Sequence, residues 1–188
     1  MLTYPNIRIY DDHGALAEAA AGLIVETAGE AIRSRGRFLL ALSGGGTPEN
    51  VYRLLAGKEY WMQLDWPAVH LFWGDERCVP PDDPGSNYRQ AKQLLIDHVP
   101  IPAAQVHRIK GELPPEKAAA EYRARLAQFA GDGRGWPVLD LALMGLGADG
   151  HTASLFPVIL DHGIALRHHF HCQYHARLTD VANMSMIP

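Results

Sequence analysis

The sequence predicts an α/β fold, with an open, mainly parallel sheet and helices on both faces. Three compact apolar runs, at 37–42, 69–73 and 138–144, are each followed by a glycine-containing turn. Segments with helical composition lie between them. Apolar strands that alternate with helices are typical of a parallel sheet covered on both sides. A length of 188 residues suits one domain.

The strands are assigned from short apolar runs bounded by turn residues. The expected strands are 6–10, 37–42, 69–73, 106–109 and 138–144. The helices are assigned from their caps. Asp12, Thr47 and Ser86 can each accept a hydrogen bond at a helix start, and Gly36 suits a helix end. The expected helices are 12–35, 48–56, 86–98 and 114–130.

The charge balance argues against two classes of partner. Lys and Arg total 17 against 21 Asp and Glu, a formal net charge of -4, whereas nucleic acids and anionic membranes select basic surfaces. No signal-like start and no run long enough to span a bilayer is visible. Cys78 and Cys172 lie far apart, which fits a reducing compartment. We therefore expect a cytoplasmic protein without nucleic-acid or membrane partners; the sequence leaves its oligomeric state open.

Ligands of open parallel sheets bind beyond the carboxyl ends of the strands. The first polar segment there is Ser43-Gly44-Gly45-Gly46-Thr47. Its glycines let backbone N–H groups approach an anion, and the following helix presents its positive end. No Gly-Lys-Ser/Thr sequence follows, so it is not a nucleotide P-loop. A phosphate cradle is favoured over a plain tight turn.

The second segment is Gly-Asp-Glu-Arg. Successive side chains of an extended strand point to opposite sides, so only one of Asp75 and Glu76 is expected to face the crevice. Arg77 suits phosphate or sugar oxygens. A surface ion pair is the competing interpretation of these residues.

The third segment contains Gly145, Gly147 and Gly150, which formally match a dinucleotide-binding pattern. The match is poor, because little chain remains for the rest of such a unit and no acidic strand end follows about 20 residues later. His151 is better interpreted as an acid/base group, since imidazole titrates near neutrality. Asp149 is close enough in sequence to orient it.

Two other chemistries are disfavoured. Ser154 lacks the G-x-S-x-G context of a serine-hydrolase nucleophile. The C-terminal histidines could ligate zinc with a cysteine if helical, but a solvated or disordered segment is the better interpretation. The residues concerned are His168, His171, Cys172 and His175.

Four segments in order resemble the 6-phosphogluconolactonase family. They are 42–48 (LSGGGTP), 71–77 (LFWGDER), 86–88 (SNY) and 144–157 (MGLGADGHTASLFP). The resemblance covers roughly residues 5–157. The sister family, glucosamine-6-phosphate deaminase, shares the Gly-Thr-Pro turn and an Asp-Gly-His. It typically continues Ile-Ala-Phe-Asn-Glu-Pro, and the position of that glutamate is not acidic here.

The resemblance implies hydrolysis of 6-phospho-D-glucono-1,5-lactone to 6-phosphogluconate in the oxidative pentose phosphate pathway. The 43–47 loop would hold the phosphate, with Arg77 as a second contact, and Asp75 would line the sugar site. His151, oriented by Asp149, would act as acid/base on the attacking water. No metal or cofactor is expected, because a lactone is already activated. A deaminase-like isomerase or a non-catalytic sugar-phosphate-binding remnant remains an alternative.

Beyond Pro157 the resemblance fades. The family usually adds an Arg-(Ile/Val)-Thr strand, a further helix and strand, and a phosphate-binding lysine, whereas residues 158–188 are rich in histidine. We therefore expect one domain over 1–157 with an atypical tail over 158–188. On this interpretation the sheet lacks C-terminal strands, which puts the activity of the chain in question.

Overall fold

Among the residues that the structure describes, the sheet has three parallel strands in the order β2-β1-β3. The computed structural model describes residues 7–131 and 136–155. β1 (Phe38–Leu42) lies at the centre, between β2 (Val69–Trp73) and β3 (Leu141–Ala142). In register, Phe38 pairs with Val69 and Leu40 with Leu141. The predicted open parallel sheet is confirmed.

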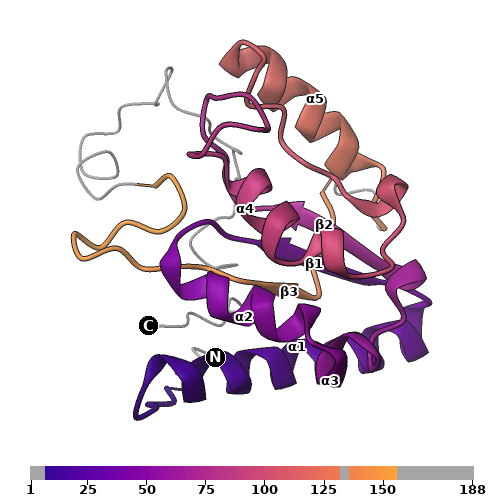
Figure 1. Cartoon of the computed structure of the whole chain (residues 1–188). Helices are drawn as coiled ribbons and strands as arrows, with labels where there is room; N and C mark the ends of the chain where they lie inside the picture. The colour runs from indigo at the N-terminus through magenta and orange to yellow at the C-terminus, as the bar shows by residue number, and fades with distance from the viewer. Residues whose placement is uncertain (1–6, 132–135, 156–188) are drawn as a thin grey trace, which may run out of the picture.

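Helices cover both sides of this sheet (Figure 1). α1 and α2 pack side by side on one side with the short α3, and α5 lies on the opposite side. The helices are α1 (His13–Arg35), α2 (Gly46–Ala56), α3 (Lys58–Trp61), α4 (Asn87–Leu94) and α5 (Pro115–Ala127). Three single 3₁₀ turns are η1 (Trp66–Ala68), η2 (Ile96–His98) and η3 (Ala103–Gln105).

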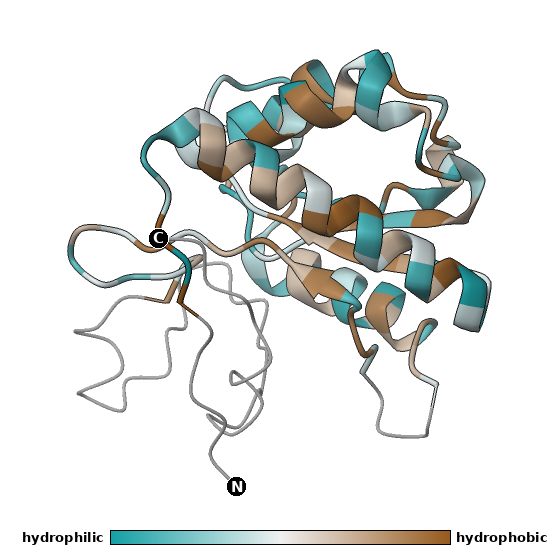
Figure 2. Cartoon of the chain, turned by 90° about the horizontal axis from the view of Figure 1, so that it is seen from below, coloured by the Kyte–Doolittle hydropathy of each residue, from teal (hydrophilic) through white to brown (hydrophobic). Residues whose placement is uncertain are grey.

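The core is built from the strands and the inner faces of the helices. All five residues of β1 are buried, as expected of a strand covered on both faces. α1 contributes mainly alanines, such as Ala21 and Ala28, which let the helix lie close to its neighbours. Figure 2 shows apolar strands at the centre and helices that carry both apolar and polar residues. The apolar faces of the helices therefore complete the core.

Two tyrosines satisfy the backbone at the carboxyl ends of the strands. The Tyr52 hydroxyl of α2 accepts a hydrogen bond from Ser43 N at 3.1 Å and donates one to Ser43 O at 2.5 Å. The Tyr122 hydroxyl of α5 does the same with Trp73 N and O, at 2.9 and 3.0 Å. Burial, together with the nearby Asp75 carboxylate, raises the pKa of the Tyr52 hydroxyl well above its usual range, although the hydrogen bond with Ser43 opposes the shift. The Tyr52 hydroxyl therefore remains protonated, and the two tyrosines fix the strand ends through these hydrogen bonds.

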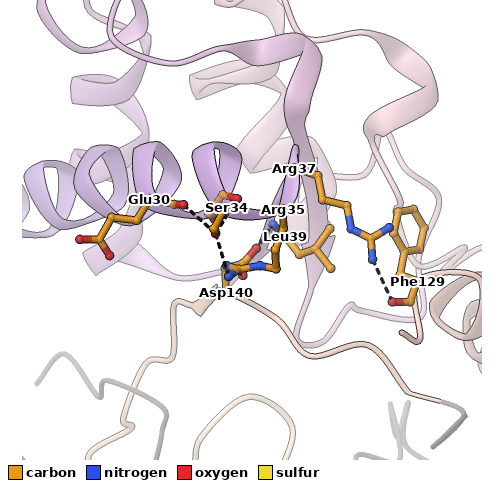
Figure 3. Close-up of polar contacts among 8 residues, drawn as sticks. Glu30, Ser34, Arg35, Arg37, Leu39, Phe129 and Asp140 are labelled. Atoms are coloured by element: carbon orange, nitrogen blue, oxygen red, sulfur yellow. Dashed lines mark hydrogen bonds and ion pairs between the residues drawn. The ribbon is translucent and has the colours of Figure 1, made fainter. Parts of the chain in front are cut away.

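Asp140, which directly precedes β3, joins β3 to β1 near the amino-terminal ends of the strands (Figure 3). Its Oδ2 accepts a hydrogen bond from Leu39 N at 2.8 Å, and its Oδ1 forms an ion pair with Arg35 at the end of α1. The backbone adds a bond from Asp140 N to Leu39 O at 3.0 Å. Nearby, Arg37 donates to Phe129 O. One carboxylate thus ties together α1, β1 and the start of β3.

Several predicted boundaries need correction. Residues 7–10 form no strand, and β3 is shorter than the predicted 138–144. Residues 106–109 give only a bridge from Val106 to Leu71. Thr47 is not an N-cap, because α2 already begins at Gly46. The predicted helix 86–98 ends at Leu94, where the backbone of Leu95 leaves the helical region.

The predicted caps at Asp12, Gly36 and Ser86 are confirmed. Asp12 Oδ1 accepts from Ala15 N at 2.8 Å, and Gly36 adopts φ 72°. Within 7–131 and 136–155, no helix is long and apolar enough to cross a bilayer. The domain boundary at 157, the tail over 158–188 and its candidate zinc residues lie outside the described residues.

Candidate active site

A cleft of about 260 Å³ opens at the carboxyl edge of the sheet. The turns after β1, β2 and β3 all contribute to its wall, as expected for a parallel sheet. Eight of the nine predicted site residues line the cleft, and the ninth, Asp149, contacts the cleft residue His151. The eight are Ser43, Gly44, Gly45, Gly46, Thr47, Asp75, Arg77 and His151.

The loop 43–47 follows β1 and leads directly into α2. Gly44 is required by close packing, because a Cβ there would lie 1.9 Å from Asn87 Oδ1. Gly45 has φ 103°, a conformation that side chains with a Cβ rarely adopt. The glycines therefore serve this backbone shape, and the start of α2 faces the cleft as predicted.

Gln90 of α4 holds the middle of this loop. Its Oε1 accepts from Gly45 N at 3.2 Å, and its Nε2 donates to Gly45 O at 3.1 Å and to Glu49 Oε1 at 2.9 Å. The Gly45 amide is consequently engaged with Gln90. The Ser43 amide donates to the Tyr52 hydroxyl, so the loop amides left for an anion are those of Gly44, Gly46 and Thr47.

Asp75 and Glu76 point in different directions, as the alternation rule predicted. Asp75 lines the cleft, and its Oδ2 accepts from Ser154 Oγ at 2.8 Å. Asn87 Nδ2 donates to Asp75 O at 3.1 Å and to Asp75 Oδ1 at 3.3 Å. This carboxylate is thus held between α4 and the loop after β3, and Asp75 is only 7% exposed.

Glu76 turns away from the cleft and caps α4. It is 4% exposed, and its carboxylate accepts four hydrogen bonds of 2.7–3.0 Å. The donors are three backbone amides and one hydroxyl, from Arg77 N, Asn87 N, Tyr88 N and Ser86 Oγ. These bonds fix the turn after β2 to α4, which places Asp75 and Arg77 on the cleft side.

His151 and Asp149 form a pair on the loop after β3, drawn in orange in Figure 1. Asp149 Oδ1 lies 2.5 Å from His151 Nδ1 and also accepts from His151 N at 3.2 Å. Hydrogen bonds from the His151 side chain and backbone hold the Asp149 pKa below its usual range. An ionised Asp149 accepts a hydrogen bond from Nδ1–H of His151, which leaves Nε2 as the nitrogen that can take up a proton.

The histidine ring rests against Gly147. A Cβ at Gly147 would lie 2.2 Å from both Cε1 and Nδ1 of His151. Gly147 N also donates to His151 O at 2.7 Å. Two residues of this loop, Gly150 with φ 84° and Ala153 with φ 50°, have positive φ. The loop shape is therefore specific, and Gly147 serves the position of the imidazole.

The structure also counts against a dinucleotide site. In such sites the third glycine opens a helix that carries the pyrophosphate. Here Gly145–Gly147–Gly150 lies in an irregular loop, and no helix follows β3 within the described residues to 155. In the same described portion, no group of three or more His, Cys, Asp and Glu could hold a metal ion.

Several cleft residues were not predicted. His13 lines the wall from the start of α1, and Asn87 and Met144 line it from α4 and the turn after β3. Their types carry no distinctive signal in sequence. The Ser86-Asn-Tyr motif was the one available indication for Asn87.

Fold and site together define an α/β protein of the parallel-sheet type with a histidine–aspartate pair at the carboxyl edge. The family model described as glucosamine-6-phosphate isomerases/6-phosphogluconolactonase matches residues 11–168. The chain belongs to this family.

Curated relatives carry the lactonase name. Probable 6-phosphogluconolactonase 3, chloroplastic, of Oryza sativa subsp. indica is 44% identical over 156 residues, covering 79% of this chain and 47% of the relative. The 6-phosphogluconolactonase of Nostoc sp. is 40% identical over 154 residues, covering 81% and 62%. The chain thus spans about half to two thirds of the length of these relatives.

Solved structures agree on the fold. That of 6-phosphogluconolactonase from Trypanosoma brucei has a TM-score of 0.72 at 31% identity, covering 82% of this chain and 64% of that one. A monomeric glucosamine-6-phosphate deaminase has a TM-score of 0.64 at 23% identity, covering 76% and 56%. The deaminase comparison shows a shared fold alone.

Proposed function

We propose that this protein hydrolyses 6-phospho-D-glucono-1,5-lactone to 6-phosphogluconate. The observation that carries the proposal is the meeting of the 43–47 loop and the His151–Asp149 pair in one cleft. Lactonase-named relatives at 40–44% identity support the same activity. The substrate class is a sugar phosphate, and the pathway is the oxidative pentose phosphate pathway.

The phosphate at C6 binds at the start of α2. Loop amides and the hydroxyls of Ser43 and Thr47 donate to its oxygens, and the positive end of the helix favours the anion. Arg77 supplies a guanidinium from the turn after β2. Asp75 accepts hydrogen bonds from sugar hydroxyls. These contacts orient the lactone so that C1 faces His151.

His151 then acts as the base. Nε2 removes a proton from water, and the water oxygen attacks C1 to give a tetrahedral intermediate. The bond between C1 and the ring oxygen breaks, and His151 returns the proton to that oxygen. Asp149 keeps the Nδ1 proton in place and stabilises the imidazolium formed between the two transfers. The product is an open-chain acid.

The deaminase-like alternative is weaker, because the residue at the position of the expected glutamate is not acidic. A non-catalytic sugar-phosphate-binding protein is the other alternative. It shares the phosphate loop but predicts no turnover. A cytoplasmic location stays a prediction, since the rice relative is named chloroplastic.

The test follows 6-phosphogluconate release from freshly prepared lactone, against the spontaneous rate. We expect acceleration by the wild type, a loss of about 10²–10⁴-fold in kcat for His151→Ala, and little change for His98→Ala. His98 is an exposed histidine in the 3₁₀ turn η2 that follows α4, and it serves as the matched control. Folded protein without acceleration would overturn the proposal, and ammonia release from glucosamine 6-phosphate would favour the deaminase.

A further inference from the structure

A second cleft lies next to the candidate active site, behind the phosphate loop. It has a volume of about 370 Å³ and shares Gly45, Arg77 and Asn87 with the first cleft. Its other lining residues come from α2, α4 and the loop before α4. They are Glu49, Arg53, Pro84, Gly85, Ser86, Arg89, Gln90, Gln93 and Leu94.

Positive charge is concentrated in this second cleft. Arg53, Arg77 and Arg89 line it against one acidic residue, Glu49, whereas the whole chain has a formal charge of -4. Arg53 lies 3.6 Å from Glu49, and its side chain remains 61% exposed. A concave surface lined by like charges focuses the field and raises the local concentration of anions.

Arg77 and Arg89 differ from several other arginines of the chain in the contacts of their guanidinium groups. Within the part of the chain that the structure describes, neither guanidinium has a hydrogen bond or ion pair. By contrast, Arg108 is paired with Glu112 in a bidentate contact and Arg35 with Asp140. Guanidinium groups bind phosphate oxygens through paired N–H donors. Two such groups face this cleft with their donors available.

The backbone amides at the start of α4 are not available to bind an anion in the second cleft, because they are already hydrogen-bonded. The amides of Asn87 and Tyr88 bond to Glu76, and that of Arg89 donates to Ser86 Oγ at 3.1 Å. Gln90 is engaged with Gly45 and Glu49. An anion in the second cleft is therefore bound by guanidinium side chains, independently of the helix end.

We propose that the second cleft is an accessory site for a diphosphate group, bound by Arg53, Arg77 and Arg89. Because Arg77 lines both clefts, an anion bound there competes with the sugar phosphate for the same guanidinium. The accessory ligand thereby weakens substrate binding. This last step rests on the proposed function, whereas the binding itself does not.

The binding test is calorimetric titration of the full chain with inorganic pyrophosphate. We expect Arg89→Gln and Arg53→Gln each to weaken binding by roughly tenfold, the effect of losing one charge-assisted contact. Arg33→Gln, at the far end of α1, is the matched control and should leave the Kd unchanged. ADP is titrated in parallel, and tighter binding of ADP than of pyrophosphate would identify a nucleotide as the source of the diphosphate.

A Kd that is unchanged in Arg89→Gln and Arg53→Gln, yet weakened in Thr47→Val, would overturn the proposal by locating the anion in the first cleft. Absence of binding to the folded wild type would do the same. In a turnover assay, pyrophosphate should raise KM without lowering kcat, and Arg89→Gln should bring the ratio of KM values with and without pyrophosphate toward one. The titration remains decisive even if the chain has no lactonase activity.

Discussion

Gln90 pairs with the backbone of Gly45 through both ends of its side-chain amide, at 3.2 and 3.1 Å. The two residues lie on different elements, α4 and the loop before α2. The contact therefore fixes the loop at the residue with the least common backbone conformation, φ 103°. The position of the 43–47 loop thus depends on a side chain from a separate element, α4.

Replacing Gln90 with Ala should raise KM by about tenfold and change kcat little, because two hydrogen bonds of about 1 kcal/mol each, partly exposed, are lost. Steady-state kinetics with the lactone measure this. Gln93→Ala, on the same helix, is the control. Equal KM values for the two variants would show that the pairing does not position the loop.

Gly147→Ala should lower kcat by roughly 100-fold while the protein stays folded. The added methyl group would lie 2.2 Å from the His151 ring and would push the imidazole out of its position. A Cβ at Gly145 meets nothing within 4 Å, so Gly145→Ala is the matched control. Rates and circular dichroism spectra of both variants decide the matter. Similar rates in the two would contradict the packing argument.

Glu76→Ala should lower the free energy of unfolding by roughly 2–4 kcal/mol, because it leaves three buried or part-buried backbone amides and a buried hydroxyl without their acceptor. Urea denaturation measures the change. Glu116→Ala, in the first turn of α5 and exposed, should cost far less. A comparable loss in both would mean that Glu76 acts only as a generic negative charge at a helix start.

His107 should make the fold sensitive to mild acid. Burial, the neighbouring His70 at 3.1 Å and Arg125 lower its pKa from 6.5 to about 4. The unfolded chain therefore binds this proton at a higher pH than the folded one, and stability falls as the pH drops from about 6.5 to 4.

The loss over this pH range should approach about 2–3 kcal/mol for the wild type. Urea midpoints at pH 7 and pH 4.5 measure it, and His107→Gln should reduce the difference between them. Exposed His98→Gln serves as the control. An undiminished difference in His107→Gln would assign the acid sensitivity to other groups.

The sequence predicted β1, β2 and the cleft because those features depend on local pattern, whereas the strands expected at 6–10 and 106–109 were wrong for the described residues. Apolar runs located β1 and β2, and glycine turns located the residues that meet at the carboxyl edge. The opposite directions of Asp75 and Glu76 were expected if the strand continued; β2 ends at Trp73, and the hydrogen bonds from α4 hold Glu76 away from the cleft instead. The length of β3 was overestimated, because flanking apolar residues such as the exposed Val138 cannot be told from buried strand residues in the sequence.

Contacts between distant segments could not be predicted. Gln90 reaches Gly45 across 45 positions, and Ser154 reaches Asp75 across 79. Neither pair has a pattern that a single sequence reveals, because any polar residue at an exposed turn could make such a bond. The second cleft, lined by Arg53, Arg77 and Arg89, depends in the same way on the packing of α2 against α4.

Asp140 has a consequence for how the protein loses activity on heating. β3 has only two residues in the sheet, and much of its hold on β1 comes from this one carboxylate and the backbone beside it. The loop bearing His151 begins just after β3. We expect His151, the proposed base, to lose its position before α1 and α2 melt. Loss of the proposed activity should then precede loss of the helical signal on heating, and Asp140→Asn should widen the gap between the two temperatures.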